Sequence, residues 1–400
     1  MNPLMKTLRT EVLSELENNI LPFWTGRMPD RLHGGFLGAL DGRGLPRPGA
    51  AKGAILNARI LWTFSAAARI TGRKDCLDTA RIALREILDR FSDPEFGGIY
   101  WSLDETGRPL DTKKQFYAIA FAIYGLSEYF RATGEPESLD AAIRLFHVIE
   151  EHSFDPQKNG YIEACTREWG EIEDMRLSEK DANERKTMNT HLHILEAYAS
   201  LYRVWKDPFL AERLRNLILL FTDRITDPLT GHLRLFFDDD WNSRDDTVSY
   251  GHDIETSWLL MEAADVLADA DVSAKVGRTM MQLAAAAEEG FTPEGGMVYE
   301  HEPATGITDG DRHWWVQAET VVGFFNLYER TGDPSALQKA AACWDFIRAH
   351  IIDREYGEWL WSLRADGSPN RTDDKAGFWK CPYHNGRMCL ELAERIARSE

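Results

Sequence analysis

The stretch FGGIYWSLDETGRP, residues 96–109, identifies the architecture, because variants of it return at a nearly constant distance along the 400-residue chain. Intervals of 63, 63, 71, 64 and 62 residues separate the glycines that begin the copies, which are Gly34, Gly97, Gly160, Gly231, Gly295 and Gly357. A regular period of several tens of residues is the signature of a repeat architecture. The chain therefore contains six copies of one structural unit.

Each copy predicts a short β-hairpin followed by two helices. Around a Gly or Asp-Gly turn, β-branched and aromatic residues alternate, which is the signal for a hairpin. The first helix is apolar on all sides, as in AILNARILWTFSAAARI (54–70), and such a helix must be buried. The second helix is amphipathic, as in DCLDTARIALREILDRF (75–91), and one of its faces must lie in water.

Six buried helices that alternate with six amphipathic ones favour an inner ring inside an outer ring. We therefore predict an all-α fold, a closed (α/α)6 barrel, that forms a single catalytic domain over residues 1–400. The short β-hairpins should gather at one rim, because each of them joins an outer helix to the next inner helix. An open solenoid of stacked helix pairs is the competing interpretation.

Charge and composition limit the partners and the location. The 46 basic residues against 65 acidic ones give a net charge of −19, which disfavours nucleic acid and anionic membranes as partners. No apolar run approaches the ~20 residues of a membrane span, and the amphipathic start MNPLMKTLRTEVLSELENNILPFW lacks the features of a signal peptide. We expect a cytoplasmic monomer or weak homodimer that binds a small molecule.

The cysteines indicate free thiols. Their number is odd and they are scattered through a large chain, which is typical of a reducing compartment. They are Cys76, Cys165, Cys343, Cys381 and Cys389.

Polar and aromatic side chains gather at or just before the first turns of the predicted inner helices. Six repeats would bring them to one end of the barrel, where they form our candidate site. The candidates are Arg59, Tyr117, Asn189, His193, His252, Glu255, Trp315, Glu319, Trp379 and His384.

Three of these histidines form the strongest signal. A single histidine near the start of an apolar helix is more often a structural residue than a catalyst. His193, His252 and His384, however, occupy comparable places in three different repeats, which favours a function. By contrast, the other histidines on or beside amphipathic helices are expected at the surface, and these are His147, His152 and His350.

A metal site is the alternative for the same histidines. His252 and Glu255 share a helical face and can serve a metal ion, whereas His191 and His193 point to different sides of their helix. No CxxC or HExxH motif accompanies them, and the segment CPYHNGRMC (381–389) cannot place both thiols and its histidine on one face. Zinc and redox roles are therefore disfavoured. Since GxGxxG and GxxxxGK[ST] loops are also missing, we predict no metal and no cofactor.

Imidazoles, carboxylates, one arginine and many aromatic rings suit a sugar ligand and proton-transfer chemistry. Histidine titrates near neutrality and can act as both base and acid. Inversion of a stereocentre next to a carbonyl needs a base on one face of the carbon and an acid on the other. Arg59 could stabilise the enediolate charge between the two proton transfers, and a third histidine could assist ring opening.

Five segments carry a resemblance to a known family. They are NARILWTF (57–64), MNTHLHILEAY (188–198), GHDIETSWLL (251–260), DRHWWVQAE (311–319) and FWKCPYHNGRMC (378–389). With all six repeats in order, the sequence resembles the cellobiose 2-epimerases of the N-acylglucosamine 2-epimerase superfamily. The resemblance implies an (α/α)6 barrel and cofactor-free epimerisation at C2 of the reducing-end glucose of β-1,4-linked disaccharides. Cellobiose would become glucosyl-mannose, and lactose would become epilactose.

The resemblance also implies roles for the candidate residues. His252 and His384 would exchange the C2 proton through a cis-enediolate, while His193 would assist ring opening and Arg59 would hold the enediolate oxygens. The remaining candidates would bind or support the substrate, and these are Tyr117, Asn189, Glu255, Trp315, Glu319 and Trp379.

Three other functions remain open at this point. The same pocket could serve an epimerase or an aldose–ketose isomerase of free mannose or glucose. An inverting glycoside hydrolase would instead use Glu255 and Glu319 as two carboxyl groups about 6.5–9.5 Å apart. A non-catalytic sugar-binding protein is the third alternative.

Overall fold

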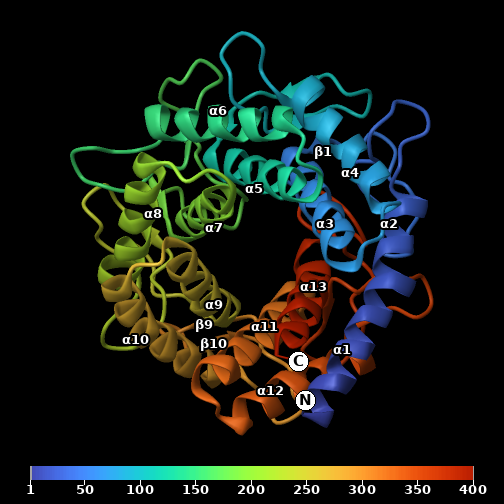
Figure 1. The fold of residues 1–400 in the computed structure, drawn as a ribbon, viewed down its shortest axis with the longest axis vertical. Helices are drawn as coiled ribbons and strands as arrows, with labels where there is room; N and C mark the ends of the chain where they lie inside the picture. Colours follow the sequence, from blue (N-terminus) through green and yellow to red (C-terminus); the bar gives the residue numbers. More distant parts are fainter. Residues whose placement is uncertain (1, 400) are drawn as a thin grey trace.

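The computed structural model describes residues 2–399 and shows a closed double ring of helices (Figure 1). Within this range, six helices form the inner ring, and they are the apolar helices predicted from the repeats. They are α3 (Ala54–Thr71), α5 (Phe116–Thr133), α7 (Met188–Val204), α9 (Tyr250–Leu267), α11 (Trp314–Thr331) and α13 (Tyr383–Arg398).

The amphipathic helices form the outer ring, and several of them end in a wider π-helical turn. Pro at the N-terminus begins several of them, as the fixed φ of proline favours. The outer ring consists of α1 (Pro3–Glu15) continued by α2 (Leu21–Arg27), α4 (Cys76–Arg85), α6 (Pro136–His152), α8 (Pro208–Leu220), α10 (Ala270–Ala287) and α12 (Pro334–Phe346).

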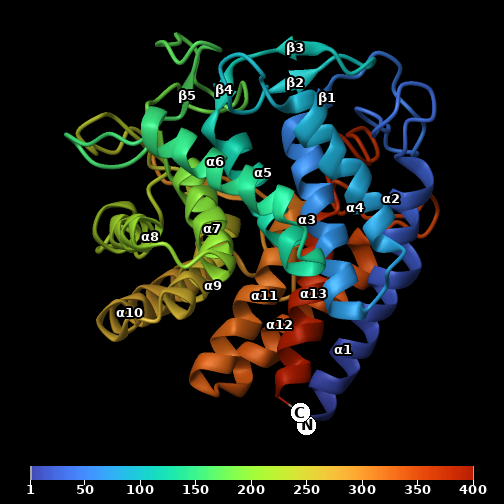
Figure 2. The same ribbon diagram turned by 45° about the horizontal axis from the view of Figure 1, so that its top comes forward.

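Short antiparallel strands lie together at one rim of the barrel, as predicted (Figure 2). Their sheets have the orders β1-β2-β3, β4-β5, β6-β7, β10-β9-β8 and β11-β12. The bounds are β1 (Lys52–Gly53), β2 (Ser102–Leu103), β3 (Pro109–Asp111), β4 (Lys114–Gln115), β5 (Ala164–Cys165), β6 (Lys186–Thr187), β7 (Phe236–Phe237), β8 (Val248–Ser249), β9 (Glu300–Glu302), β10 (Ile307–Asp309), β11 (Arg312–His313) and β12 (Ser362–Leu363).

The strands join neighbouring copies more than they join the two arms of one hairpin. The strand before each inner helix pairs with the hairpin of the next copy, as Lys52 does with Leu103. The same pairing closes the ring, because Leu40 of the first copy bridges Ala376 of the last through a 2.8 Å backbone hydrogen bond. Helix α13 also packs against both α1 and α3. The barrel is therefore closed, and the open solenoid is wrong.

A buried lysine pins the rim in several copies. In the first copy, Lys52 Nζ lies 2.8 Å from Asp30 Oδ2 and donates to the carbonyl oxygen of Gly34 at 2.8 Å. The aspartate in turn accepts two backbone N–H groups of its own turn. The same pairs recur in other copies as Lys114–Asp93, Lys186–Asp155 and Lys375–Asp353. We call these four pairs the rim pins.

The interior is one continuous apolar core between the two rings, and all five cysteines are buried within it as free thiols. The prediction of free thiols is therefore confirmed. Over residues 2–399, the helices are too short or too polar for any of them to cross a membrane.

Candidate active site

One position of the inner helices supplies a set of buried side chains at a similar depth of the barrel. It is the sixth residue of α3, α5, α7, α9 and α11, and the fifth residue of α13, which becomes the sixth when the N-cap Pro382 is counted as the first. Because the helices are equivalent by repeat symmetry, equal positions meet at equal depth. We call these residues the lumen ring, and they are Arg59, Phe121, His193, Glu255, Glu319 and Arg387.

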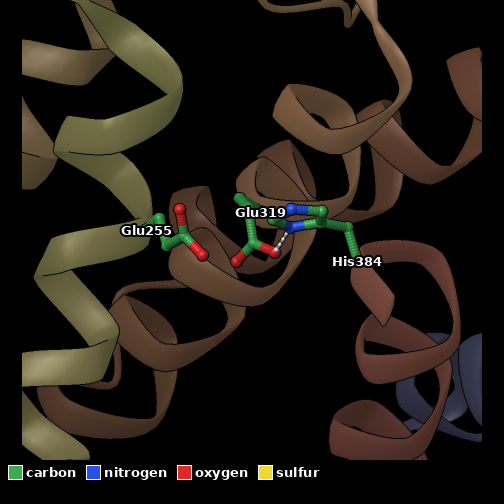
Figure 3. Close-up of side chains that lie close together, drawn as sticks. All are labelled: Glu255, Glu319 and His384. Carbon is green, nitrogen blue, oxygen red and sulfur yellow. Dashed lines mark hydrogen bonds and ion pairs between the residues drawn. The ribbon is translucent and has the colours of Figure 1, made fainter. Parts of the chain in front are cut away.

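His384 lies above this ring and is held by a carboxylate. Its Nδ1 lies 2.7 Å from Oε1 of Glu319, which comes from the neighbouring helix α11 (Figure 3). An Nδ1–H that donates to Glu319 leaves Nε2 unprotonated and available as a base. Burial, together with the positive charge of Arg59, lowers the pKa of His384 well below its usual value. The imidazole is thus neutral at pH 7 in the free site.

His252 occupies the equivalent place on α9, but its partner is uncharged. Its Nδ1 lies 2.8 Å from the hydroxyl oxygen of Ser249. Burial lowers the pKa of His252 to about 3, so this imidazole is also neutral at pH 7. The ring of Trp315 lies beside both imidazoles, with its centroid 4.8 Å from that of His252 and 5.7 Å from that of His384. Two basic groups therefore border the same aromatic ring.

His193 is positioned by Glu196, one turn further along α7. Its Nδ1 lies 2.9 Å from Oε2 of Glu196, and Glu196 also accepts a hydrogen bond from the hydroxyl of Tyr383 at 2.5 Å. Burial alone would raise the pKa of Glu196, but Arg387 and His193 outweigh it and lower the pKa to about 2. Glu196 is therefore an anion that fixes the tautomer of His193.

Arg387 holds together the carboxylates at the base of the site. Its guanidinium donates to Glu196 on α7, to Glu255 on α9 at 2.6 Å and to Glu319 on α11 at 2.7 Å. One cation cannot neutralise three carboxylates. Burial, together with the negative charge of nearby Glu319, accordingly raises the pKa of Glu255 well above its usual value.

Arg59 contrasts with Arg387, because it has no carboxylate partner within residues 2–399. Its guanidinium donates to the hydroxyl of Tyr117 at 2.9 Å and to the carbonyl oxygen of Trp379 at 3.4 Å. It also lies 4.2 Å from the centre of the Phe121 ring. A buried cation without a counter-ion is suited to a negative charge that develops on a bound molecule.

The metal alternative has one candidate group in the described part of the chain. Ligand atoms of Glu255, Glu319 and His384 lie within 4.8 Å of one another. Both carboxylates, however, already accept hydrogen bonds from Arg387, whose positive charge opposes a cation at the same place. The two cysteines near His384 do not join this group: Cys381 lies 3.7 Å from Arg59, and Cys389 faces the core.

Position four of the inner helices explains why His191 differs from His193. His191 is the fourth residue of α7, and its Nε2 accepts the backbone N–H of Tyr161 at 2.9 Å, which holds the turn of the same copy in place. Two other copies use different side chains for the same contact. Asp253 accepts from Leu233, and Gln317 accepts from Met297, each at 2.8 Å. His191 is therefore a structural histidine.

The structure brings the predicted candidates together at one mouth of the barrel. Tyr117 lies 4.9 Å from His193 and 6.0 Å from Trp379, measured between ring centres. Asn189 lies on the first turn of α7, and its buried Oδ1 has no hydrogen-bond partner among the described residues.

Sequence reasoning missed Glu196, Phe121 and Arg387. Arg387 stands inside a quoted motif, and an alignment of the inner helices by their sixth residue would have found both it and Phe121. Glu196 lies outside this register, so only its helical spacing from His193 hinted at a contact.

This fold and site define a class of protein: (α/α)6-barrel carbohydrate enzymes that present histidines at the N-terminal ends of the inner helices. The chain belongs to the N-acylglucosamine 2-epimerase (GlcNAc 2-epimerase) family, whose model matches residues 34–386. It is accordingly a carbohydrate epimerase, an enzyme of the isomerase class.

Several similar proteins are known as cellobiose 2-epimerases. The one from Bacteroides fragilis is 63% identical over 96% of this chain and 98% of its own length. That from Ruminococcus albus is 41% identical over 96% of this chain and 98% of its own. The solved structure of the Bacillus thermoamylovorans enzyme superposes with a TM-score of 0.93 at 42% identity, covering 98% and 100% of the two chains. The predicted relationship and barrel are thus confirmed.

Proposed function

We propose that this chain epimerises C2 of the reducing-end glucose of β-1,4-linked disaccharides, with cellobiose going to glucosyl-mannose and lactose to epilactose. The observation that carries the proposal is the pair of buried imidazoles, His252 and His384, whose rings both lie beside that of Trp315. The similarity to enzymes known as cellobiose 2-epimerases supports the choice of substrate.

The proposed reaction begins with opening of the hemiacetal ring. His193 moves the proton between the anomeric hydroxyl and the ring oxygen, and Glu196 keeps its Nε2 directed into the pocket. The open chain then presents a C1 aldehyde, which makes the hydrogen at C2 acidic enough for an imidazole to remove.

In the central step, one imidazole enters neutral, takes the C2 proton and becomes an imidazolium. The other imidazole enters as an imidazolium, having taken a proton from the solvent, and gives that proton to the opposite face of C2. The electrons of the broken C–H bond form the C1–C2 double bond of a cis-enediolate, and negative charge develops on O1. The uncompensated guanidinium of Arg59 stabilises this charge. In the reverse reaction the two imidazoles exchange their roles. Glu319 stabilises His384 whenever that residue is an imidazolium.

The aromatic rings bind the sugar faces. Trp315, Trp379 and Tyr117 present apolar surfaces to the C–H groups, while Asn189 and Glu255 offer hydrogen bonds to hydroxyl groups.

The glycoside hydrolase alternative fits the geometry poorly. Oxygens of Glu255 and Glu319 approach within 4.8 Å, whereas an inverting hydrolase needs about 6.5–9.5 Å between its carboxyl groups to accommodate a water molecule. Both groups are also engaged by Arg387.

Proton NMR of cellobiose incubated with the EDTA-treated enzyme in D2O tests the proposal. We expect a mannose-type epimer with deuterium at C2. Free glucose would instead indicate hydrolysis. If cellobiose stays unchanged while mannose or glucose reacts, the chain acts on free hexoses. No reaction with any of these sugars would leave only a binding function.

A further inference from the structure

Glu163 is a buried carboxyl group at the mouth of the barrel that has no cationic partner. It immediately precedes β5 and is 1% exposed. Its carboxyl accepts hydrogen bonds from the hydroxyls of Thr187 at 2.8 Å and Thr190 at 2.6 Å. Within residues 2–399, no lysine, arginine or histidine lies within ion-pair distance of it. A buried carboxylate without a counter-ion costs free energy, so its role needs an explanation.

The charged groups near Glu163 do not fully offset the free-energy cost of burying its charge. Lys113, which precedes β4, lies 3.9 Å from Asp111 and only partly offsets the charge of Glu163. Asp181, in the segment before β6, is a second carboxyl group. Burial raises the pKa of Glu163 to about 7, and Asp181 adds to the shift while the two threonine hydroxyls oppose it.

Both hydroxyl donors belong to the first turn of α7. Thr187 is the N-cap of this helix, and its hydroxyl oxygen accepts the backbone N–H of Thr190 at 3.1 Å. Glu163 therefore holds the cap and the residue three positions later at the same time. Between them stands Asn189, whose Oδ1 has no partner, and His193 follows one turn later. The orientation of this turn sets the direction of both side chains.

We propose that Glu163 is a positioning residue for the epimerisation proposed above: its carboxylate clamps the first turn of α7 so that Asn189 and His193 face the sugar. The ionised form makes two short, charge-assisted hydrogen bonds, which are stronger than those of a neutral amide. The clamp thus trades folding stability for a defined orientation.

If Glu163 positions the site at a cost in stability, its substitution should change Tm and kcat/KM in opposite directions, which a merely structural residue would not do. Because the pKa of Glu163 is raised from about 4.3 in the unfolded chain to about 7 in the folded protein, the protein loses stability as the pH rises between these two values. Glu163→Gln removes the charge and keeps the shape. At pH 8 the variant should therefore melt at a higher temperature than the natural protein. At pH 5 this gain in Tm should be smaller.

Activity should move in the opposite direction. With the charged clamp gone, we expect kcat/KM on cellobiose at pH 8 to fall about tenfold, since a small misplacement of a catalytic side chain costs up to about a hundredfold. Thr190→Val and Thr190→Ser form the matched pair, because only serine keeps the hydroxyl that donates to Glu163. The valine variant should lose kcat/KM and the serine variant should keep it.

The experiment measures Tm and kcat/KM of the natural protein and these three variants at pH 5 and pH 8. A parallel fall of Tm and kcat/KM in Glu163→Gln would overturn the proposal, as would equal kcat/KM in Thr190→Val and Thr190→Ser. If the natural protein itself does not epimerise cellobiose, the proposed function fails, and this proposal falls with it. The natural protein therefore separates the two failures.

Discussion

The rim pins and the lumen ring both contain buried charged side chains at repeated positions, yet they differ in two respects. Each rim pin joins a lysine to an aspartate of the same copy, 21 to 31 residues away. The lumen ring uses four residue types in its six copies, and Arg387 reaches glutamates 68, 132 and 191 residues away.

The difference teaches how to separate structure from function in a repeat protein. A contact that returns with the same residues in several copies solves a problem that every copy has, which is to fold its own turn. A position that returns with a different residue in each copy contributes to something assembled once. We expect substitutions in the two regions to affect different measurements.

The largest effect is expected above the lumen ring. His384→Ala and His252→Ala should each lower turnover of cellobiose by about 10³-fold or more, because each removes a group that transfers the C2 proton. Circular dichroism and the melting temperature should stay close to those of the natural protein. Full activity in either variant would remove that histidine from the proposed mechanism.

Breaking a rim pin should have the converse effect. Lys52→Met leaves Asp30 buried without its cation, and this should lower the free energy of unfolding by about 3–5 kcal/mol. Denaturant titration measures the loss, while kcat per folded molecule should be retained. A loss of kcat with unchanged stability would show that the pins also serve the site.

The same variant should lose part of its acid sensitivity. Burial alone would raise the pKa of Asp30, but Lys52 and the backbone N–H groups of its turn lower it to about 2. Stability from such a group is complete above pH 4 and is lost as the pH falls through 2. Between pH 4 and pH 2, Lys52→Met should therefore lose less stability than the natural protein.

His191 and His193 sharpen the comparison within a single helix. His191→Leu leaves the buried N–H of Tyr161 without an acceptor, which should cost about 1–3 kcal/mol of stability and little activity. His193→Leu should instead reduce turnover. Equal effects of the two substitutions on turnover would contradict the separation of positions four and six.

The smallest effect is expected where a rim pin is missing. Val248 stands at the strand position of Lys52 in the fourth copy, and Asp227 there pairs with Arg234 at 3.0 Å. Val248→Lys should change the free energy of unfolding by less than about 1 kcal/mol, because Arg234 already neutralises the aspartate. A stabilisation as large as the loss in Lys52→Met would show that Arg234 is no substitute.

The sequence alone allowed the fold and most of the site to be predicted, because both depend on periodicity. The 62- to 71-residue intervals and the alternation of apolar and amphipathic helices were sufficient for an inner and an outer set of six helices. Closure itself depends on contacts such as Leu40 with Ala376, which no local pattern reveals. The contact between Arg387 and Glu196 could not be predicted for the same reason, since the two residues lie on different helices. In the sequence, Glu163 resembles any other residue of a hairpin. Only the structure shows that its carboxyl group is buried without a cationic partner among the described residues.

Ring closure has a consequence for the way the chain folds. Residue 40 meets residue 376, and α13 packs between α1 and α3, so the last inner helix completes the core of the first copy. Contacts of such high sequence separation form late, because the entropy of a very long loop has to be overcome first. During synthesis, the apolar face of α3 that packs against α13 stays uncovered until residues 383–398 have left the ribosome. We expect the chain to depend on chaperones until α13 has formed.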